Sequence, residues 1–502
     1  MPSSMACLLV LLVVHTSTAV INPSANLKTV NQWNLISYNF PYGMNTNDPE
    51  IYNPMNIVAT GVAVAYDRLF VATPKLFSGV TSTISTIRKD LLGDSPVLEA
   101  FPDWSFHRPG RQNVSCNDLQ LISVYRLKID SCNRLWALDA GISRSLEDFE
   151  KTCPPKILVF DLNTNQVVRR IDFPPEVLRG ESLFTNIIID ETTSKPGGTC
   201  DDVFIYISDT VEPGIVVYDS VRDMTWRVSH PAMFPDPDFA QSDIQGYKFV
   251  LMDGVVGLAF DDQDLIYFQP LATDRLFSVS KQVLRAGPIP LNQLLPVKLV
   301  GKKSSQGIGL AVTTSDKSIV FAPMTETAVA SYNPYTNEQS ILAYDPERLQ
   351  FIGDMQVSRF NPGELFIVSS RFHRFFLKNL DGNDINTRIL KIDLPQYTQP
   401  HVGYSPSYNH HYSSLPNFPY FPLNSNSIDR HSNNEVFTSI RQPFPYEPVG
   451  LKGPKSPFQA LNQGELFPNS QKQSHKQGYN SYHGHNRVRF AKSIPNNQTA
   501  IA

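Results

Sequence analysis

A turn-and-strand phrase that returns six times constrains this 502-residue chain more than any other feature. Each copy is a polar turn followed by a short apolar strand, and successive copies begin about 45 to 70 residues apart. The copies are YDRLFVA (66–72), CNRLWALDA (132–140), DDVFIYISD (201–209), DDQDLIYFQ (261–269), SDKSIVFAP (315–323) and NPGELFIVS (361–369). Another apolar strand precedes each copy, so each repeat is expected to form a small antiparallel sheet. Such recurrence is typical of repeat architectures, and the closed form of this unit is an all-β, six-bladed β-propeller.

The six predicted blades follow one another along the chain without long interruptions. Their approximate ranges are 56–101, 121–173, 183–230, 254–300, 306–344 and 350–393. An earlier strand-like segment, Trp33–Phe40, has no partner in its own neighbourhood. We expect it to complete the last blade, because closing the ring in this way removes an exposed sheet edge.

Both ends of the chain differ from the repeats. A short apolar run that ends in small residues predicts a secretory signal peptide over 1–19. The propeller is then expected over 20–395, followed by a disordered tail over 396–502 that is rich in Pro, Asn, Ser and His. No other segment predicts a membrane span, and the net charge of −4 does not favour a nucleic-acid partner. The sequence therefore predicts a secreted, extracellular protein.

Four cysteines remain after cleavage of the predicted signal peptide, and an even number in a secreted chain suggests two disulfides. Cys116 precedes the inner strand of blade two, and Cys153 returns to the same end of that blade. Cys132 and Cys200 lie in equivalent inner turns of blades two and three. A bond across the height of a blade would exceed the span of a disulfide. We therefore predict Cys116–Cys153 and Cys132–Cys200.

Sequence motifs for catalysis are scarce. There is no G-x-S-x-G elbow, H-E-x-x-H helix or phosphate-binding loop, so no catalytic residue, metal or cofactor is predicted. Asp139, Asp209 and Asp253 fall at strand ends or channel-side loops, where a carboxylate binds a cation or an amine, or simply caps a turn. The basic, aromatic stretch Arg371–Arg374 is consistent with an exposed strand. Asn113 and Asn497 begin glycosylation triplets.

Several longer phrases resemble the Yellow / major royal jelly protein family. They include FPDWS (101–105), CNRLWALDAG (132–141), CPPKILVFDL (153–162), CDDVFIYISD (200–209), FPDPDF (234–239), MDGVVGLAF (252–260) and FQPLATDRLFSVS (268–280). The resemblance covers roughly residues 30 to 395, in order. It implies a secreted insect protein with a six-bladed propeller, which agrees with the repeat count, but members differ in activity, so the fold does not choose among functions.

Three functions are open on this resemblance. The first is a non-catalytic extracellular protein of cuticle or eggshell pigmentation or sclerotisation, which binds catecholamine-like ligands or matrix. The second is a dopachrome-converting enzyme of the melanin pathway, which needs a base with a near-neutral pKa and a donor for the quinone oxygen. The third is a scavenger of biogenic amines. Candidate ligand-binding residues at channel-side ends are Thr185, Asn186, Asp253, Asn333 and Phe372. A calcium-dependent propeller hydrolase is a further alternative at the level of the fold, although only Asp253 and Asn186 offer ligands for it.

Overall fold

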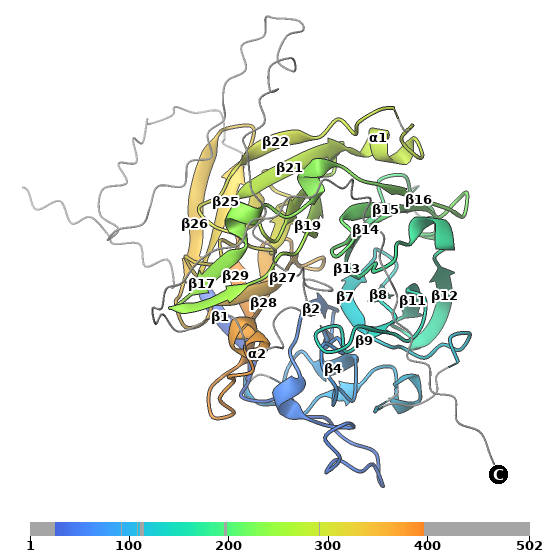
Figure 1. Ribbon diagram of the computed structural model, residues 1–502, viewed down its shortest axis with the longest axis vertical. Helices are drawn as coiled ribbons and strands as arrows, with labels where there is room; N and C mark the ends of the chain where they lie inside the picture. The colour runs from blue at the N-terminus through green and yellow to red at the C-terminus, as the bar shows by residue number, and fades with distance from the viewer. Residues whose placement is uncertain are drawn as a thin grey trace, which may run out of the picture. The chain divides into compact units, whose positions relative to one another are not determined.

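Six antiparallel sheets succeed one another along the chain in the computed structural model, which describes residues 26–395 apart from 92, 108, 111–114, 195–197 and 291. Figure 1 shows these sheets arranged in chain order about a common centre. The innermost strand of each sheet lies beside the innermost strand of the next sheet along the chain, and that of the sixth sheet lies beside that of the first. The fold is therefore the closed, six-bladed β-propeller that the repeats predict.

Each blade consists of four main strands, which run from the innermost outward in the order in which they are named. Blade one contains β2 (Gly61–Val64), β3 (Arg68–Ala72), β4 (Ile84–Arg88) and β6 (Glu99–Ala100). Blade two contains β7 (Val124–Ile129), β8 (Arg134–Asp139), β11 (Lys156–Asp161) and β12 (Gln166–Asp172). Blade three contains β13 (Phe184–Asp190), β14 (Phe204–Asp209), β15 (Gly214–Asp219) and β16 (Met224–Val228).

The second half of the ring repeats this order. Blade four contains β19 (Val255–Phe260), β20 (Leu265–Pro270), β21 (Arg275–Ser280) and β22 (Lys298–Lys302). Blade five contains β23 (Leu310–Val312), β24 (Ile319–Phe321), β25 (Ala328–Asn333) and β26 (Glu338–Tyr344). Blade six contains β27 (Phe351–Val357), β28 (Glu364–Ser370), β29 (Thr387–Asp393) and β1 (Leu27–Trp33), with the short β5 (Gly93–Asp94) at its edge.

The remaining elements lie in the connections between blade strands. They are the hairpins β9 (Ile142–Ser143) with β10 (Glu150–Lys151) and β17 (Gln241–Ile244) with β18 (Tyr247–Val250), the helices α1 (Lys281–Arg285) and α2 (Phe372–Phe376), and short 3-10 turns at Pro54–Asn56, Trp104–Phe106, Pro175–Val177, Pro231–Met233 and Pro237–Phe239. No helix within the described part of the chain is long and apolar enough to cross a membrane.

The ring closes with an N-terminal strand in blade six, as expected, but the closing strand is earlier than predicted. It is β1, Leu27–Trp33, which pairs antiparallel with β29. The predicted segment, Trp33–Phe40, begins where β1 ends and is mostly irregular. Trp33 is fully buried, and its indole Nε1 donates to Pro96 O at 2.7 Å. The apolar residues after Trp33 pack as a loop rather than as a strand, which is why their composition alone misplaced the pairing.

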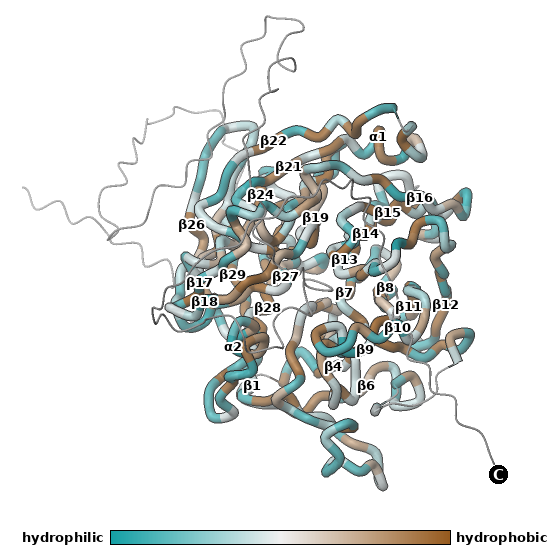
Figure 2. The backbone as a smooth tube through the Cα atoms, viewed as in Figure 1, coloured by the Kyte–Doolittle hydropathy of each residue, from teal (hydrophilic) through white to brown (hydrophobic). Residues whose placement is uncertain are grey.

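Alternating side chains fill the spaces between neighbouring blades. In β14, Phe204 and Tyr206 pack toward blade four, whereas Ile205 and Ile207 pack toward blade two. This follows from the period of two in a strand, which places successive side chains on opposite faces of a sheet. Six such apolar layers, one per blade interface, make up most of the core. Figure 2 shows hydrophobic residues mainly along the strands and hydrophilic residues at most turns.

Two disulfides fasten blades two and three, with the pairing predicted from strand order. Cys116 bonds Cys153 with a Cα–Cα distance of 5.4 Å, and Cys132 bonds Cys200 with a distance of 6.1 Å. The second bond joins the inner turns of two adjacent blades. The predicted signal peptide, the predicted tail, Asn113 and Asn497 lie outside the described residues.

Candidate functional site at the upper mouth

A seventh apolar cluster lies at one end of the ring, where the innermost strands begin. We call this end the upper face and the opposite end the lower face. The cluster draws residues from all six blades and from the β17–β18 hairpin, among them Phe77, Tyr125, Leu183, Phe249, Val256, Leu271, Met324, Phe351 and Phe375. The six clusters between blades each serve one interface, whereas this cluster gathers around the ring axis. It marks the upper mouth of the channel as the place where side chains from the whole ring meet.

Bulges recur near the start of four innermost strands and shape the wall below this cluster. The pairing shifts by one residue near the start of β7, β13, β19 and β27. The residues skipped in the pairing are Tyr125, Thr185, Val256 and Gly353. A bulge redirects a side chain and often occurs beside functional sites. Because the four bulges occupy the same level of the ring, they place these residues together beneath the mouth.

Two of the three channel-side aspartates have structural roles. Asp139 accepts hydrogen bonds from backbone N–H groups, including that of Ser123 at 2.8 Å, and its carboxylate lies 3.1 Å from Lys156 Nζ. Asp209 is arranged in the same way in the next blade, with Arg227 Nη1 at 2.9 Å. Both aspartates are fully buried, and buried charges persist when paired in this manner. Each aspartate links the second strand of its blade to the start of the innermost strand, and these contacts use its carboxylate oxygens.

Asp253 differs from both. It precedes β19, and its backbone carbonyl accepts from Ala272 N at 3.2 Å. Its Oδ1 is buried and has no hydrogen-bond partner among the described residues. Burial raises the pKa of Asp253 to about 7, because removal from water disfavours the charged carboxylate. A carboxyl group poised between its two protonation states at neutral pH suits proton transfer, and such groups concentrate at functional sites.

Tyr125 interacts electrostatically with Asp253. Tyr125 belongs to blade two and Asp253 to blade four, and the carboxylate is close enough to raise the pKa of the phenol, after the larger effect of burial. Since blade three separates these blades around the ring, their interaction runs across the mouth. The Tyr125 hydroxyl lies 2.7 Å from Ser145 Oγ, in the loop between β9 and β10. The phenol of Tyr125 therefore stays protonated at neutral pH.

Thr185 and Asn186 lie at the upper end of β13, at the level of the bulges, and both are buried. Asn186 Nδ2 donates to Val256 O at 2.9 Å, which ties blade three to blade four. Thr185 Oγ1 forms hydrogen bonds with the hydroxyls of Ser208 and Thr210. Both residues thus sit near Asp253, but their polar groups are engaged within the protein.

Phe372 is the first residue of α2 and contributes an aromatic face to the mouth. Its ring stacks on Phe351 with centroids 4.6 Å apart, and Phe351 begins the innermost strand of blade six. The stretch Arg371–Arg374, which the sequence suggested as an exposed strand, is instead the start of this short helix, and His373 within it is fully buried. The run of phenylalanines around it explains the difference, because it packs into the mouth cluster.

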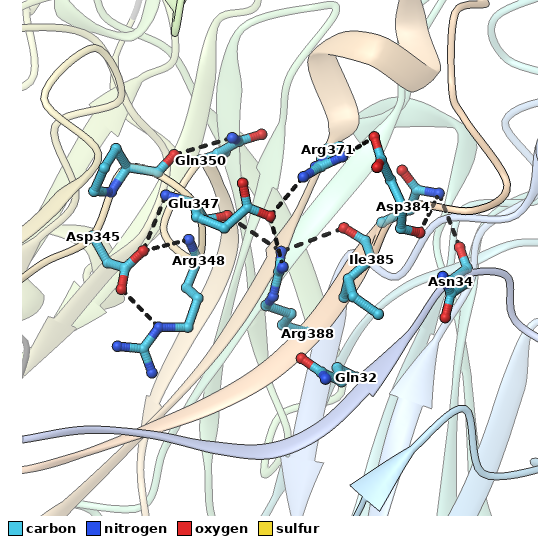
Figure 3. Close-up of polar contacts among 12 residues, drawn as sticks. Gln32, Asn34, Asp345, Glu347, Arg348, Gln350, Arg371, Asp384, Ile385 and Arg388 are labelled. Atoms are coloured by element: carbon cyan, nitrogen blue, oxygen red, sulfur yellow. Dashed lines mark hydrogen bonds and ion pairs between the residues drawn. The ribbon is translucent and has the colours of Figure 1, made fainter.

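An ion network holds α2 in place. Arg371 donates to Glu347 Oε1 at 2.6 Å and also pairs with Asp384, to which Arg374 donates at 2.7 Å. Figure 3 shows Glu347 between Arg371 and Arg388, and Asp384 beside Arg371. The network ties both ends of the β28–β29 connection to the loop before β27, so α2 is fixed over the inner strand of blade six.

The structure does not bring Asn333 to this mouth. Asn333 ends β25, the third strand of blade five, so it lies at the lower face. Its Oδ1 accepts from Tyr335 N at 2.9 Å, and its Nδ2 donates to Asp316 O at 2.9 Å. These are turn contacts. Of the five candidate residues, the structure thus places Thr185, Asn186, Asp253 and Phe372 at the upper face and Asn333 at the lower face.

Three residues of the mouth were absent from the predicted set: Tyr125, Ser242 and His373. Ser242 belongs to β17, and its buried hydroxyl has no partner in the described part of the chain, as is true of both ring nitrogens of His373. His373 interrupts an aromatic run and Tyr125 lies in an apolar strand. Ser242 stands between Gln241 and Asp243, where no signal in the sequence distinguishes it. Within the described ranges, no group of three or more His, Cys, Asp or Glu residues is placed to hold a metal ion.

The fold and this mouth define a six-bladed β-propeller with a carboxyl group and aromatic side chains gathered at one end of its channel. Comparison with known sequences then gives the family. The model of the family described as "Major royal jelly protein" matches residues 122–402, so the chain belongs to that family.

Among curated relatives, the chain is similar to Dopaminechrome tautomerase of Drosophila melanogaster, with 27% identity over 68% of this chain and 75% of the relative. It is also similar to Protein yellow of Drosophila pseudoobscura pseudoobscura, with 28% identity over 77% of this chain and 70% of the relative. Among solved structures, virginiamycin B lyase from Staphylococcus aureus has a TM-score of 0.36 and 10% identity, covering 63% of this chain and 79% of the lyase. A likeness of that size has no bearing on activity.

Proposed function

We propose that this chain is an extracellular protein of pigment chemistry that binds catecholamine-derived quinones at the upper mouth and catalyses their tautomerisation. The observation that carries the proposal is Asp253, a half-buried residue whose buried Oδ1 has no partner among the described residues and whose pKa is raised to about 7. The similarity to Dopaminechrome tautomerase supports it. The two disulfides are consistent with the oxidising environment outside the cell.

The proposed reaction moves two protons within the substrate, one from each of its two saturated ring carbons to its two quinone oxygens. The carboxylate of Asp253 takes a proton from one saturated ring carbon of an aminochrome, and the electrons of that C–H bond enter the ring. One quinone oxygen gains a proton in this step, and the same transfer from the neighbouring saturated carbon to the second quinone oxygen then gives the aromatic dihydroxyindole. Substrate and product are isomers, so the step needs no oxidant or reductant. A base whose pKa is near the working pH is suited to this task.

The surroundings of Asp253 fit such a substrate. Phe372 and Phe351 offer stacked aromatic faces for a flat bicyclic ring. The Tyr125 hydroxyl is a hydrogen-bond donor that stays neutral, since burial raises its pKa. Apolar side chains from all six blades exclude water, which strengthens the electrostatic effect of each polar group.

A second candidate function is a non-catalytic pigment protein that binds such ligands or matrix without changing them. The similarity to Protein yellow, whose name states no reaction, favours it. The side chains that fill the mouth also favour it, because a ligand must displace or reorder them.

Turnover separates the two functions. The secreted protein is mixed with freshly prepared dopaminechrome, and the loss of quinone absorbance is followed for wild type, Asp253→Asn and Asp67→Asn. Asp67 lies in the β2–β3 turn with a side chain 73% exposed, so its variant is a matched control. The proposal expects turnover by wild type and the control, and a loss of about 100-fold or more in Asp253→Asn. Binding without turnover in all three proteins would support the non-catalytic function instead.

A further inference from the structure

Several buried polar atoms at the upper mouth have no hydrogen-bond partner among the described residues. They are Asp253 Oδ1, the Ser242 hydroxyl in β17, both ring nitrogens of His373 in α2, and Nε of Arg371 and Arg374, whose other guanidinium nitrogens are paired. Buried polar groups in folded proteins are nearly always paired, because an unpaired group forfeits its hydrogen bonds to water. Asp253 belongs to the proposed reaction, whereas Ser242 and His373 have no task in it so far. Their shared lack of partners is consistent with polar groups that await a ligand.

Ser242 and His373 lie on facing elements. The ring of His373 contacts Tyr247 and Phe249 of β18, with centroids 5.5 and 6.3 Å apart. Ser242 is the cross-strand partner of Phe249, so their side chains share one face of the hairpin. Ile244 and Phe249 on that face are buried in the mouth cluster, whereas Tyr247 at its edge is exposed. The hairpin therefore presents a hydroxyl, and α2 an imidazole, to the same aromatic region.

The electrostatic surroundings of His373 select the kind of group that it can bind. Burial, followed by the positive charges of Arg374 and Arg371, lowers the pKa of His373 to about 4. The imidazole is therefore neutral, with one donor and one acceptor nitrogen. The two nearby guanidinium groups, although paired with Glu347 and Asp384, favour an electron-rich oxygen over an ammonium group beside His373. This end of the mouth thus suits the oxygens of a ligand, whereas an ammonium group is favoured near Asp253.

We propose that His373 and Ser242 form an oxygen-binding subsite for the two adjacent oxygens of a catechol or ortho-quinone ring. The ring lies against Phe249 and Phe372, and its side-chain end points toward Asp253. This orientation also sets a saturated carbon of an aminochrome toward the proposed base. The choice of a catechol or ortho-quinone as the ligand rests on the proposed function, but binding at the subsite does not depend on turnover.

Ligand pairs test the subsite by binding alone. Dopamine carries both ring hydroxyls, and phenethylamine has the same ring and amine without them. Calorimetric titration is made on the full secreted protein and on His373→Phe, Ser242→Ala and Gln245→Ala; Gln245 is exposed at the tip of the hairpin and serves as the matched control. Wild type and the control are expected to prefer dopamine by about 10-fold or more, as two hydrogen bonds allow.

The preference for dopamine over phenethylamine in His373→Phe and Ser242→Ala tests whether these side chains bind the ring oxygens. In His373→Phe the preference is expected to fall to about 2-fold or less, with phenethylamine affinity retained, and in Ser242→Ala it is expected to fall part of the way. A structural role alone would weaken both ligands equally. No preference in wild type, or full preference in both variants, overturns the subsite. If His373→Phe does not fold, Ser242→Ala provides the test. Loss of preference in a protein without turnover supports the subsite and refutes the proposed reaction.

Discussion

Substitution of Asp253 by Asn is expected to stabilise the protein above neutral pH while it lowers turnover by about 100-fold or more. Folding removes the carboxyl group from water and raises its pKa from 3.8 to about 7. A raised pKa in the folded state means that ionisation disfavours folding. The stability associated with the neutral group is fully present below about pH 4 and is lost as the pH rises to about 7. Asn is isosteric and neutral at every pH, so it avoids this loss.

The magnitude follows from the pKa shift. A shift of about three units corresponds to roughly 4 kcal/mol of unfolding free energy at pH 8. The Asn amide places its own unpaired donor in the mouth, which offsets roughly 1–3 kcal/mol of the gain at all pH values. The clearest quantity is therefore the change with pH: the difference between variant and wild type should grow by roughly 4 kcal/mol between pH 4 and pH 8.

Denaturant unfolding at several pH values measures this difference directly, with Asp67→Asn as the exposed control. Turnover of dopaminechrome by wild type should rise with pH and level off above about pH 7, since the base must be ionised. A stability difference that does not change with pH would show that Asp253 titrates normally. The assignment of Asp253 as a base poised near neutrality would then be refuted.

Three further changes test the scaffold. Trp33→Ala should lower the unfolding free energy by about 3–5 kcal/mol, because it removes a fully buried side chain from the closing strand of blade six; thermal unfolding measures it. Replacement of Cys132 and Cys200 together by Ser opens a bond between residues 68 positions apart and should cost about 4 kcal/mol, measured by denaturant unfolding against wild type. Asp384→Asn should cost less than about 1 kcal/mol, because the carboxylate is 40% exposed, yet it should weaken dopamine binding in calorimetry by loosening α2; unchanged binding would contradict an anchoring role.

The propeller could be predicted because its determinants are local and repeated. Each blade carries its own turn, its own strand and its own alternation of side chains, as β14 illustrates with Tyr206 facing one neighbour and Ile207 the other. The disulfides followed from the same regularity, since strand order places each cysteine at one end of a blade. Closure was harder to locate, because Leu27–Trp33 pairs with a strand more than 350 residues away and no local signal fixes that register.

The candidate site was predicted only in part, and the reason is visible in its aspartates. Asp139, Asp209 and Asp253 look alike in sequence, each beside a strand end. Only the fold shows that Lys156 and Arg227 neutralise the first two, whereas no described residue pairs with Oδ1 of the third.

The sequence by itself determined the repeat, the number of blades and the partners of the cysteines, because these depend on periodicity and on distances within and between adjacent blades. The tertiary structure decided which polar groups remain unpaired. Asp253 precedes β19, Ser242 lies in the β17–β18 hairpin and His373 lies in α2. Among the described residues, their unpaired atoms share one apolar mouth only because the ring closes. The pKa of a carboxyl group depends on what surrounds it in space, and side chains from all six blades supply that environment.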